Sequence, residues 1–188
     1  KKLLIHYGID TKMISYFEYN RIKRIPEIID FLKSDIDIAL VTDAGTPGIS
    51  DPAYKLIRSA ITNDLRVENI PGPSAFLSAL VVSGLPTVRF LFVGFLPPKK
   101  GRKKKILELA KIEATLIFYE NPKKLVRTLV DISNYIGNRP TVVCRELTKL
   151  HEETIRGTTT DIISHFNENP CRGECVILVG KLKKNVFF

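Results

Sequence analysis

Strand-like and helix-like segments alternate almost without interruption from Arg21 to Lys181. Apolar residues recur at helical spacing over residues 21–32, and a strand-like segment follows at residues 36–41, of which residues 38–41 form a continuous apolar run. Helical spacing of apolar residues indicates an amphipathic helix, whereas a short continuous apolar run is typical of a strand that is covered on both faces. Repeated alternation of the two predicts an α/β protein, because helices then pack against the faces of a sheet.

The alternation continues along the chain and divides into two sets of elements. Strands are predicted at residues 66–70, 90–95, 114–119, 141–146, 152–156 and 174–181, and helices at residues 52–61, 75–83, 102–111, 122–136 and 160–166. The segment Ser83-Gly84-Leu85-Pro86 predicts a helix stop and a hinge between the two sets. We therefore predict two α/β domains, residues 1–85 and 86–188, with a ligand cleft where they join.

The first predicted strand runs directly into a loop of small, acidic and turn-forming residues. Ala44-Gly45-Thr46-Pro47-Gly48 supplies tight turns whose backbone groups are free to approach a small molecule. Ser50 or Asp51 can then cap a helix that begins at Pro52. Ligands of open α/β sheets bind beyond the carboxyl ends of strands, so this loop is a candidate ligand site. An ordinary strand-to-helix turn has a similar composition.

The positive charge of the chain is large and unevenly distributed. Lys and Arg number 29 against 20 Asp and Glu, which gives a formal net charge of +9. Residues 99–105, Lys-Lys-Gly-Arg-Lys-Lys-Lys, are almost entirely cationic. A surface of this composition attracts phosphates with an affinity that falls as salt rises. A solvated loop and first helical turn in a Lys-rich chain would have the same composition without binding phosphates.

Several classes of protein are excluded by what the sequence lacks. No stretch approaches the roughly 18 consecutive apolar residues of a transmembrane helix, and three widely spaced cysteines do not make a disulfide framework. Cys171 and Cys175 have no second Cys or His pair at zinc-site spacing, so we expect no metal. Neither a Gly-x-x-x-x-Gly-Lys-Ser/Thr loop nor a Gly-x-Gly-x-x-Gly fingerprint is present. We expect a cytoplasmic protein without a membrane partner, in which a small-molecule pocket adjoins a polyanion-binding surface.

Five motifs occur in the order and approximate spacing of one protein family. They are Val41–Pro52, Pro71–Ala75, Gly94–Pro97, Leu116–Glu120 and Arg145–Lys149. On these motifs the chain resembles the small-subunit rRNA ribose 2′-O-methyltransferases of the tetrapyrrole methylase superfamily. Residues 14–20 and 152–157 extend the resemblance over essentially the whole chain.

The resemblance implies two α/β domains that bind S-adenosylmethionine in the cleft between them, usually as a homodimer. It also implies methylation of a cytidine ribose in the RNA of the small ribosomal subunit. The cofactor-binding residues that it implies are Asp43, Ala44, Gly45, Pro47, Ile49, Ser74, Ala75, Phe118, Tyr119, Leu147 and Gly173. Members of the family begin with a further strand and a Pro-Thr-Pro-Ile-Gly-Asn-Leu-like loop. Neither precedes Lys1, so we expect the first strand of the N-terminal domain to be missing from this chain.

Methyl transfer to a ribose hydroxyl requires orientation of the reactants and is helped by a base, because the hydroxyl is weakly acidic. Carboxylates at predicted strand ends are candidates for that base, and a nearby Lys can offset the developing negative charge. The candidate catalytic residues are Glu120, Glu146 and Lys149, with Asp43 as a further carboxylate. Glu146 has a simpler alternative role, an ion pair with Arg145 or Lys149.

An RNA substrate also requires cationic groups that hold its backbone. The predicted RNA-binding residues are Lys99, Lys100, Arg102, Lys103, Lys104, Lys105, Lys123, Lys124 and Arg145. Two alternative functions stay open at this point: a methylase that acts on a tetrapyrrole, and an RNA-binding module without catalytic activity. The extended cationic run disfavours the first, because a small pocket-bound substrate gains little from it. Cofactor binding distinguishes either enzyme from the module.

Overall fold

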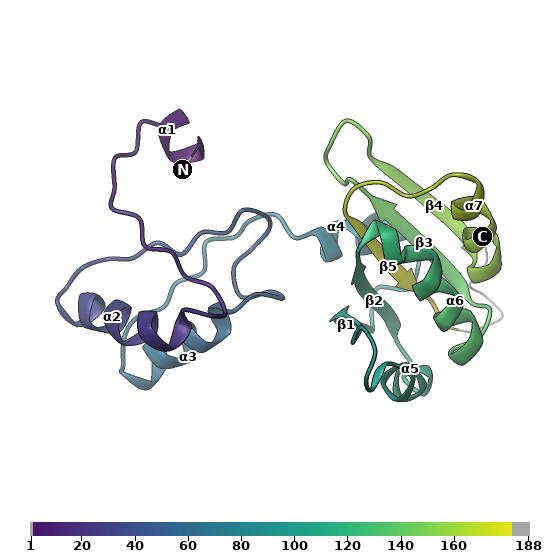
Figure 1. The fold of residues 1–188 in the computed structure, drawn as a ribbon, viewed down its shortest axis with the longest axis horizontal. Helices are drawn as coiled ribbons and strands as arrows, with labels where there is room; N and C mark the ends of the chain where they lie inside the picture. The colour runs from purple at the N-terminus through teal and green to yellow at the C-terminus, as the bar shows by residue number, and fades with distance from the viewer. Residues whose placement is uncertain (1, 182–188) are drawn as a thin grey trace. The chain divides into compact units, whose positions relative to one another are not determined.

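A computed structural model describes residues 2–181, in which contacts divide the chain into two units, one up to Gly72 and one from Pro73 onward (Figure 1). Lys1 and residues 182–188, the outer ends of the two predicted domains, lie outside the described residues. The division between the units falls before the predicted boundary at residues 85/86, because helix α4 (Ala75–Ser83) packs on the sheet of the second unit.

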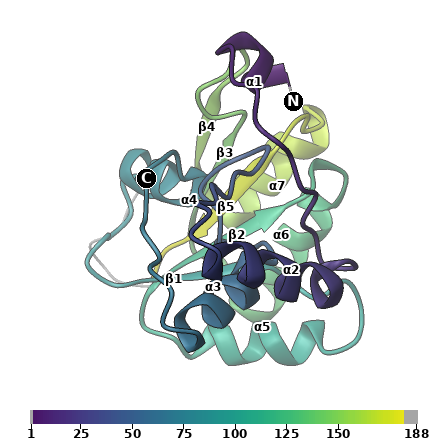
Figure 2. The same ribbon diagram turned by 90° about the vertical axis from the view of Figure 1, so that its left-hand side faces the viewer.

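Helices are the only regular elements described in the first unit. They are α1 (Lys2–His6), α2 (Arg21–Lys33) and α3 (Ala53–Thr62). Helices α2 and α3 lie side by side (Figure 1, Figure 2) and bury a small set of apolar side chains, which are Ile28, Ile29, Ala53, Leu56 and Ala60. This stripe matches the helical spacing of apolar residues in the sequence.

The strands predicted in the first unit, residues 36–41 and 66–70, are not formed among the residues that the structure describes. A strand is stabilised by hydrogen bonds to a neighbouring strand, and neither segment pairs with another described segment. Val41 is accordingly 70% exposed, although its apolar neighbours predict a covered strand. For these two segments the prediction was wrong.

The second unit contains a five-stranded mixed sheet. Its strands are β1 (Phe90–Phe95), β2 (Thr115–Glu120), β3 (Pro140–Arg145), β4 (Glu153–Thr158) and β5 (Cys175–Val179), in the order β1-β2-β5-β3-β4. Strands β1 and β2 are parallel, and β5 runs antiparallel to both β2 and β3. The remaining helical elements are α5 (Arg102–Ala110), the 3₁₀ turn η1 (Pro122–Lys124), α6 (Leu125–Tyr135) and α7 (Thr159–Glu168). The predicted bounds of these strands and helices agree within about two residues.

Helices cover both faces of this sheet (Figure 1). Helices α5, α6 and α7 bury the larger apolar cluster, which includes Leu116 and Phe118 of β2. Helix α4 buries a second cluster on the opposite face, with Ile117 of the same strand. Because successive side chains of a strand point to opposite faces, β2 serves both clusters. The α/β class predicted from the sequence is confirmed by this unit.

Local signals in the sequence set the ends of two helices. Helix α4 ends at Gly84, whose φ of 77° lies in the left-handed region that glycine adopts without a steric penalty. Helix α7 begins with a capping box, in which the side chains of Thr158 and Asp161 bond to each other's backbone N–H. The cysteines Cys144 and Cys175 are buried on strands, as expected of small apolar residues, and all three cysteines are free.

Candidate functional site

The carboxyl ends of β1, β2 and β3 lie at one edge of the sheet, because these three strands run in the same direction. In the register, Phe95 faces Tyr119, and both Glu120 and Arg145 face Cys175 at the start of β5. Residues 118–121 and 144–149, which include the predicted site residues Tyr119, Glu120 and Leu147, therefore meet here. The predicted ligand loop that follows residues 36–41 belongs to the first unit.

Aromatic side chains gather on the α4 side of this edge. The ring of Phe92 stacks on that of Phe76 with centroids 4.4 Å apart, and it meets Tyr119 edge-on at 5.0 Å. Phe95 approaches Tyr119 at 5.7 Å. Burial raises the pKa of Tyr119, and a hydrogen bond with the Phe76 backbone opposes that rise. The Tyr119 side chain thus lies near the backbone of Phe76, in the first turn of α4.

Four of the predicted cofactor residues belong to this same region. Ser74 is the N-cap of α4 and Ala75 its first residue, while Tyr119 and Leu147 pack against the α4 cluster. The side chain of Ser74 makes no cap hydrogen bond. Within the described chain, the Ser74 hydroxyl thus accepts no hydrogen bond from the first backbone N–H groups of α4. We call the residues Ser74, Ala75, Phe76, Phe92, Tyr119 and Leu147 the α4-side edge.

Two other predicted site residues of β2 point away from the α4-side edge. Phe118 is fully buried in the cluster beneath α5, α6 and α7, so its side chain offers no surface to a ligand. Glu120 is 8% exposed, and its carboxylate accepts hydrogen bonds from Thr128 Oγ1 at 2.6 Å and from the Asn121 backbone N–H at 2.7 Å. The alternation of side chains along β2 therefore separates the Glu120 carboxylate from Tyr119.

Glu146, Lys149 and Gly173 form a small cluster beyond the ends of β3 and β5. The Glu146 carboxylate accepts hydrogen bonds from the Glu174 backbone N–H at 2.9 Å and from Lys149 Nζ at 3.1 Å. Lys149 Nζ also lies 3.2 Å from a carboxylate oxygen of Glu174. The simpler alternative for Glu146 is therefore realised with Lys149, whereas Arg145 pairs with Glu153.

The electrostatics of this cluster follow from these contacts. The backbone N–H of Glu174 and the Lys149 ammonium lower the pKa of Glu146. The carboxylates of Glu146 and Glu174 raise the pKa of Lys149. A lowered pKa makes the Glu146 carboxylate a weak base at neutral pH. Gly173, with a φ of 80°, lies so close to this carboxylate that a Cβ there would come within 2.3 Å of it. The cluster thus joins two loops at the edge of the sheet.

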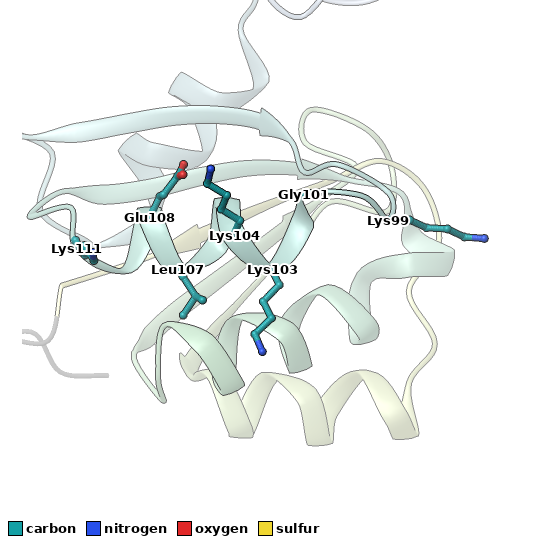
Figure 3. Close-up of a pocket in the computed structure, with 7 residues that line it drawn as sticks. All are labelled: Lys99, Gly101, Lys103, Lys104, Leu107, Glu108 and Lys111. Carbon is teal, nitrogen blue, oxygen red and sulfur yellow. The ribbon is translucent and has the colours of Figure 1, made fainter.

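The predicted cationic surface is divided by the fold. Lys99, Lys103 and Lys104 line a shallow groove of about 670 Å³ along α5, together with Gly101, Leu107, Glu108 and Lys111 (Figure 3). Lys100 and Lys105 are exposed outside the residues that line it, and Lys123 and Lys124 are exposed in η1. Sequence analysis missed Lys111, although it lies one helical turn beyond Leu107 and two beyond Lys103.

Arg102 is a correction to the predicted RNA-binding set, because it is only 8% exposed. Its guanidinium donates hydrogen bonds to Asp131 Oδ2 at 2.7 Å, to Thr128 Oγ1 at 2.7 Å and to the Pro97 carbonyl at 3.2 Å. All three guanidinium nitrogens therefore already donate a hydrogen bond within the protein, so they are not available to a phosphate. Arg102 is therefore a structural residue that joins α5, α6 and the loop after β1.

The predicted ligand loop of the first unit is organised by Asp51. Its carboxylate accepts hydrogen bonds from the Gly48 backbone N–H at 2.9 Å and from the Ala53 backbone N–H at 2.8 Å. The N-cap residue of α3 is nevertheless Pro52 and not one of the two predicted residues, because the helix begins one residue later than predicted. Predicted cofactor residues of the loop remain accessible. Asp43, Ala44, Gly45 and Ile49 are exposed, and Pro47 is half-buried.

Among residues 2–181, no helix is both long and apolar enough to cross a membrane. Over the same residues, no three His, Cys, Asp or Glu side chains gather as a metal site would require.

Known proteins are similar to this chain in sequence. The profile of the family described as Tetrapyrrole (Corrin/Porphyrin) Methylases matches residues 10–163. A protein of Halalkalibacterium halodurans named ribosomal RNA small subunit methyltransferase I is 47% identical over 186 residues, which are 98% of this chain and 64% of that protein. A protein of the same name from Thermotoga maritima is 43% identical over 180 residues, which are 95% of this chain and 81% of that protein. This chain thus spans less than two thirds of the Halalkalibacterium relative.

Solved structures with low sequence identity also share the fold. The crystal structure of the methyltransferase CobJ superposes with a TM-score of 0.62 at 18% identity, covering 85% of this chain and 71% of that chain. The uroporphyrin-III C-methyl transferase from Thermus thermophilus, complexed with S-adenyl homocysteine, gives a TM-score of 0.60 at 15% identity, covering 93% of this chain and 79% of that chain. These structures confirm the predicted fold, and the family profile with the sequence relatives confirms the resemblance that the motifs predict.

Proposed function

Because this chain belongs to the tetrapyrrole (corrin/porphyrin) methylase family, we propose that it serves S-adenosylmethionine-dependent methylation of a ribose 2′-hydroxyl in small-subunit ribosomal RNA. The relatives named ribosomal RNA small subunit methyltransferase I support the RNA substrate. The observation that carries the proposal is the gathering of Ser74, Ala75, Tyr119 and Leu147 at the α4-side edge. A cytidine as the target nucleotide, a homodimer and a cytoplasmic location are parts of the same proposal.

The chemistry of the α4-side edge fits the proposed cofactor. Small-molecule sites combine apolar and aromatic side chains with a few backbone or hydroxyl groups that fix orientation. Here the rings of Phe92 and Tyr119 and the side chain of Leu147 supply the apolar part, and the start of α4 at Ser74 supplies backbone N–H groups. When bound, S-adenosylmethionine supplies an electrophilic methyl group on a sulfonium. The exposed loop residues Asp43, Ala44, Gly45, Pro47 and Ile49 stay predicted cofactor contacts.

The chain's own residues have distinct parts in this proposal. Tyr119 and Leu147 orient the cofactor, and the loops that Glu146 and Gly173 join border the same edge. Two carboxylates contact the Lys149 ammonium and offset its charge, so contact of Lys149 with an RNA phosphate or a developing alkoxide stays a prediction that requires these ion pairs to open. Glu120 and Glu146 stay candidate bases. Their hydrogen bonds in this structure support a structural role for each of them alongside the catalytic one.

Calorimetry with S-adenosylhomocysteine tests the cofactor site. Tyr119→Ala removes the ring that Phe92 and Phe95 contact, and we expect it to weaken binding about tenfold or more, which corresponds to ~1.4 kcal/mol. Tyr119→Phe keeps the ring and should retain most of the affinity. Tyr54→Ala is the matched control, because Tyr54 is 60% exposed on α3. Equal affinities of Tyr119→Ala and the unchanged protein would place the cofactor elsewhere.

A second candidate function is RNA binding without catalysis, which the lysine-lined groove along α5 favours. Transfer of a tritiated methyl group to small-subunit RNA separates the two. Methylation supports the proposed enzyme. RNA binding without S-adenosylhomocysteine binding supports the binding module. Methyl transfer to a tetrapyrrole precursor, with none to RNA, would instead favour the alternative methylase.

A further inference from the structure

The lysines along α5 do not form one uniform patch. Lys99, Lys103, Lys104 and Lys111 line the groove, and Glu108 is the single acidic residue beside them. We call this set the lysine groove. Figure 3 shows Lys104 and Glu108 pointing to one side of α5 and Lys103 to the other, so the cations border the helix on both sides. Four positive charges against one negative charge make the groove attractive to an anionic partner.

The spacing of these lysines suits an extended anion. Lys103 and Lys111 are eight positions apart, which is about 12 Å along a helix. An ion as small as one phosphate cannot contact both. Lys103 Nζ lies 5.3 Å from the centre of the Tyr135 ring, a cation–π contact that keeps its ammonium over α6. Helix α5 also has no acidic residue in its first turn to offset its cations.

We propose that the lysine groove binds the sugar–phosphate backbone of RNA and serves as a docking surface distinct from the α4-side edge. The lining side chains carry charge but no aromatic ring or amide that reads a base, so the groove holds RNA without selecting its sequence. This inference rests on the proposed function, because RNA is the polyanion that the proposed reaction uses.

The fold separates this docking surface from the α4-side edge. Ile106 and Leu109 of α5 pack in the cluster with Phe118, whereas Tyr119 packs in the cluster of α4. The groove and the α4-side edge therefore belong to helices on opposite faces of the sheet. Strand β1 is one of the two edge strands of the sheet and, among the described residues, pairs with β2 alone. An RNA that uses both surfaces would pass around the sheet, and the groove would anchor a part of the RNA remote from the target ribose.

The salt dependence of RNA binding tests this docking surface. The probe is a fluorescent single-stranded RNA of 20 nucleotides, and the full chain is titrated into it by anisotropy at several salt concentrations. A plot of log K against log salt has a negative slope, and each lost phosphate contact makes it shallower by about 0.7 for a single strand. The triple variant Lys103→Gln, Lys104→Gln, Lys111→Gln should therefore make the slope shallower by about 2 and weaken binding at least about tenfold.

Two neighbouring residues provide a matched pair of single variants. Lys104→Gln and Lys105→Gln remove the same charge from the same helix, but only Lys104 lines the groove. We expect Lys104→Gln to weaken RNA binding and Lys105→Gln to weaken it much less. Glu108→Gln should strengthen binding, because it removes the only acid of the groove. Equal effects of the two lysine variants, or an unchanged slope in the triple variant, would overturn the proposal.

Controls separate the lysine groove from the proposed function. The triple variant should bind S-adenosylhomocysteine as the unchanged protein does, and its far-UV circular dichroism should be unaltered. An unchanged protein that binds RNA through these lysines but does not bind S-adenosylhomocysteine would refute methyl transfer and leave the groove supported. A triple variant that keeps its RNA affinity but no longer binds phosphatidylserine vesicles would identify a lipid surface and overturn the RNA proposal.

Discussion

The two units of this chain carry similar apolar patterns but use them differently. In the second unit every strand has a hydrogen-bonded neighbour, and side chains such as Ile117 and Phe118 are fully buried. In the first unit the apolar run at residues 36–41 forms no strand, and Ile36 is 50% exposed. The comparison teaches that an apolar run specifies where a strand is possible. Pairing with a neighbour decides whether the strand forms.

One ion pair from each unit shows a contrast in burial. Arg102 and Asp131 pair in the second unit with side chains only 10% and 24% exposed, whereas Arg66 and Glu68 pair in the first unit at 86% and 57%. A buried pair that loses one partner leaves an unsatisfied charge, while water solvates the remaining partner of an exposed pair. The ion pairs of Arg102 and Arg66 are therefore expected to contribute different amounts to stability.

The largest expected effect tests this difference in ion pairs. Arg102→Ala leaves Asp131 unpaired and Thr128 without its donor, and should lower the free energy of unfolding of the second unit by about 3–5 kcal/mol. Arg66→Ala should change the free energy of unfolding by about 1 kcal/mol or less. Urea denaturation followed by circular dichroism measures both variants. Similar losses in the two would show that burial does not set the strength of these pairs.

The next effect tests the contrast between covered and unpaired apolar runs. Ile117→Ala creates a cavity between β2 and α4 and should cost about 2–5 kcal/mol. Ile36→Ala makes the same chemical change at a half-exposed position and should cost less than about 1 kcal/mol. The same denaturation experiment applies. A cost at Ile36 as large as that at Ile117 would mean that residues 36–41 are covered in solution.

A pair of glycines sharpens the comparison further. Gly173 and Gly48 both have a positive φ, but a Cβ at Gly173 would meet the Glu146 carboxylate at 2.3 Å, whereas at Gly48 the nearest atom is Ile57 Cδ1 at 3.6 Å. Gly48→Ala should cost about 1–2 kcal/mol through backbone strain alone. Gly173→Ala should cost about 2–3 kcal/mol, because it also displaces Glu146 from the Glu174 N–H. Equal melting shifts would exclude this contact.

The smallest expected effect is a dependence of stability on pH. Contacts with the Glu174 N–H and Lys149 lower the pKa of Glu146 in the folded protein. The stability that they contribute is therefore present above the ordinary carboxyl pKa of 4.5 and is lost as pH falls through the lowered value. Glu146→Gln should flatten this part of the acid limb in thermal melts at different pH values. An acid limb identical to that of the unchanged protein would show that these contacts do not persist in solution.

The opposite sign applies to Lys149, whose pKa is raised by Glu146 and Glu174. Its contribution is present below the ordinary pKa of 10.5 and is lost as pH rises through the raised value. Lys149→Met should therefore reduce the loss of stability on the alkaline side. Melts between neutral and strongly alkaline pH measure this difference, and an unchanged alkaline limb would contradict it.

Sequence alone determined most elements of the second unit, because periodicity and capping residues are local properties of the chain. Alternation along a strand even implies that Phe118 and Tyr119 face opposite sides. Tertiary structure decided the rest. The meeting of residues 118–121 with 144–149 depends on β5, which lies between β2 and β3 in the sheet. Arg102 is buried while its lysine neighbours are exposed, since its partner Asp131 lies 29 residues away. Residues 36–41 form no strand because they pair with no other described segment, and no local signal in the sequence specifies such pairing.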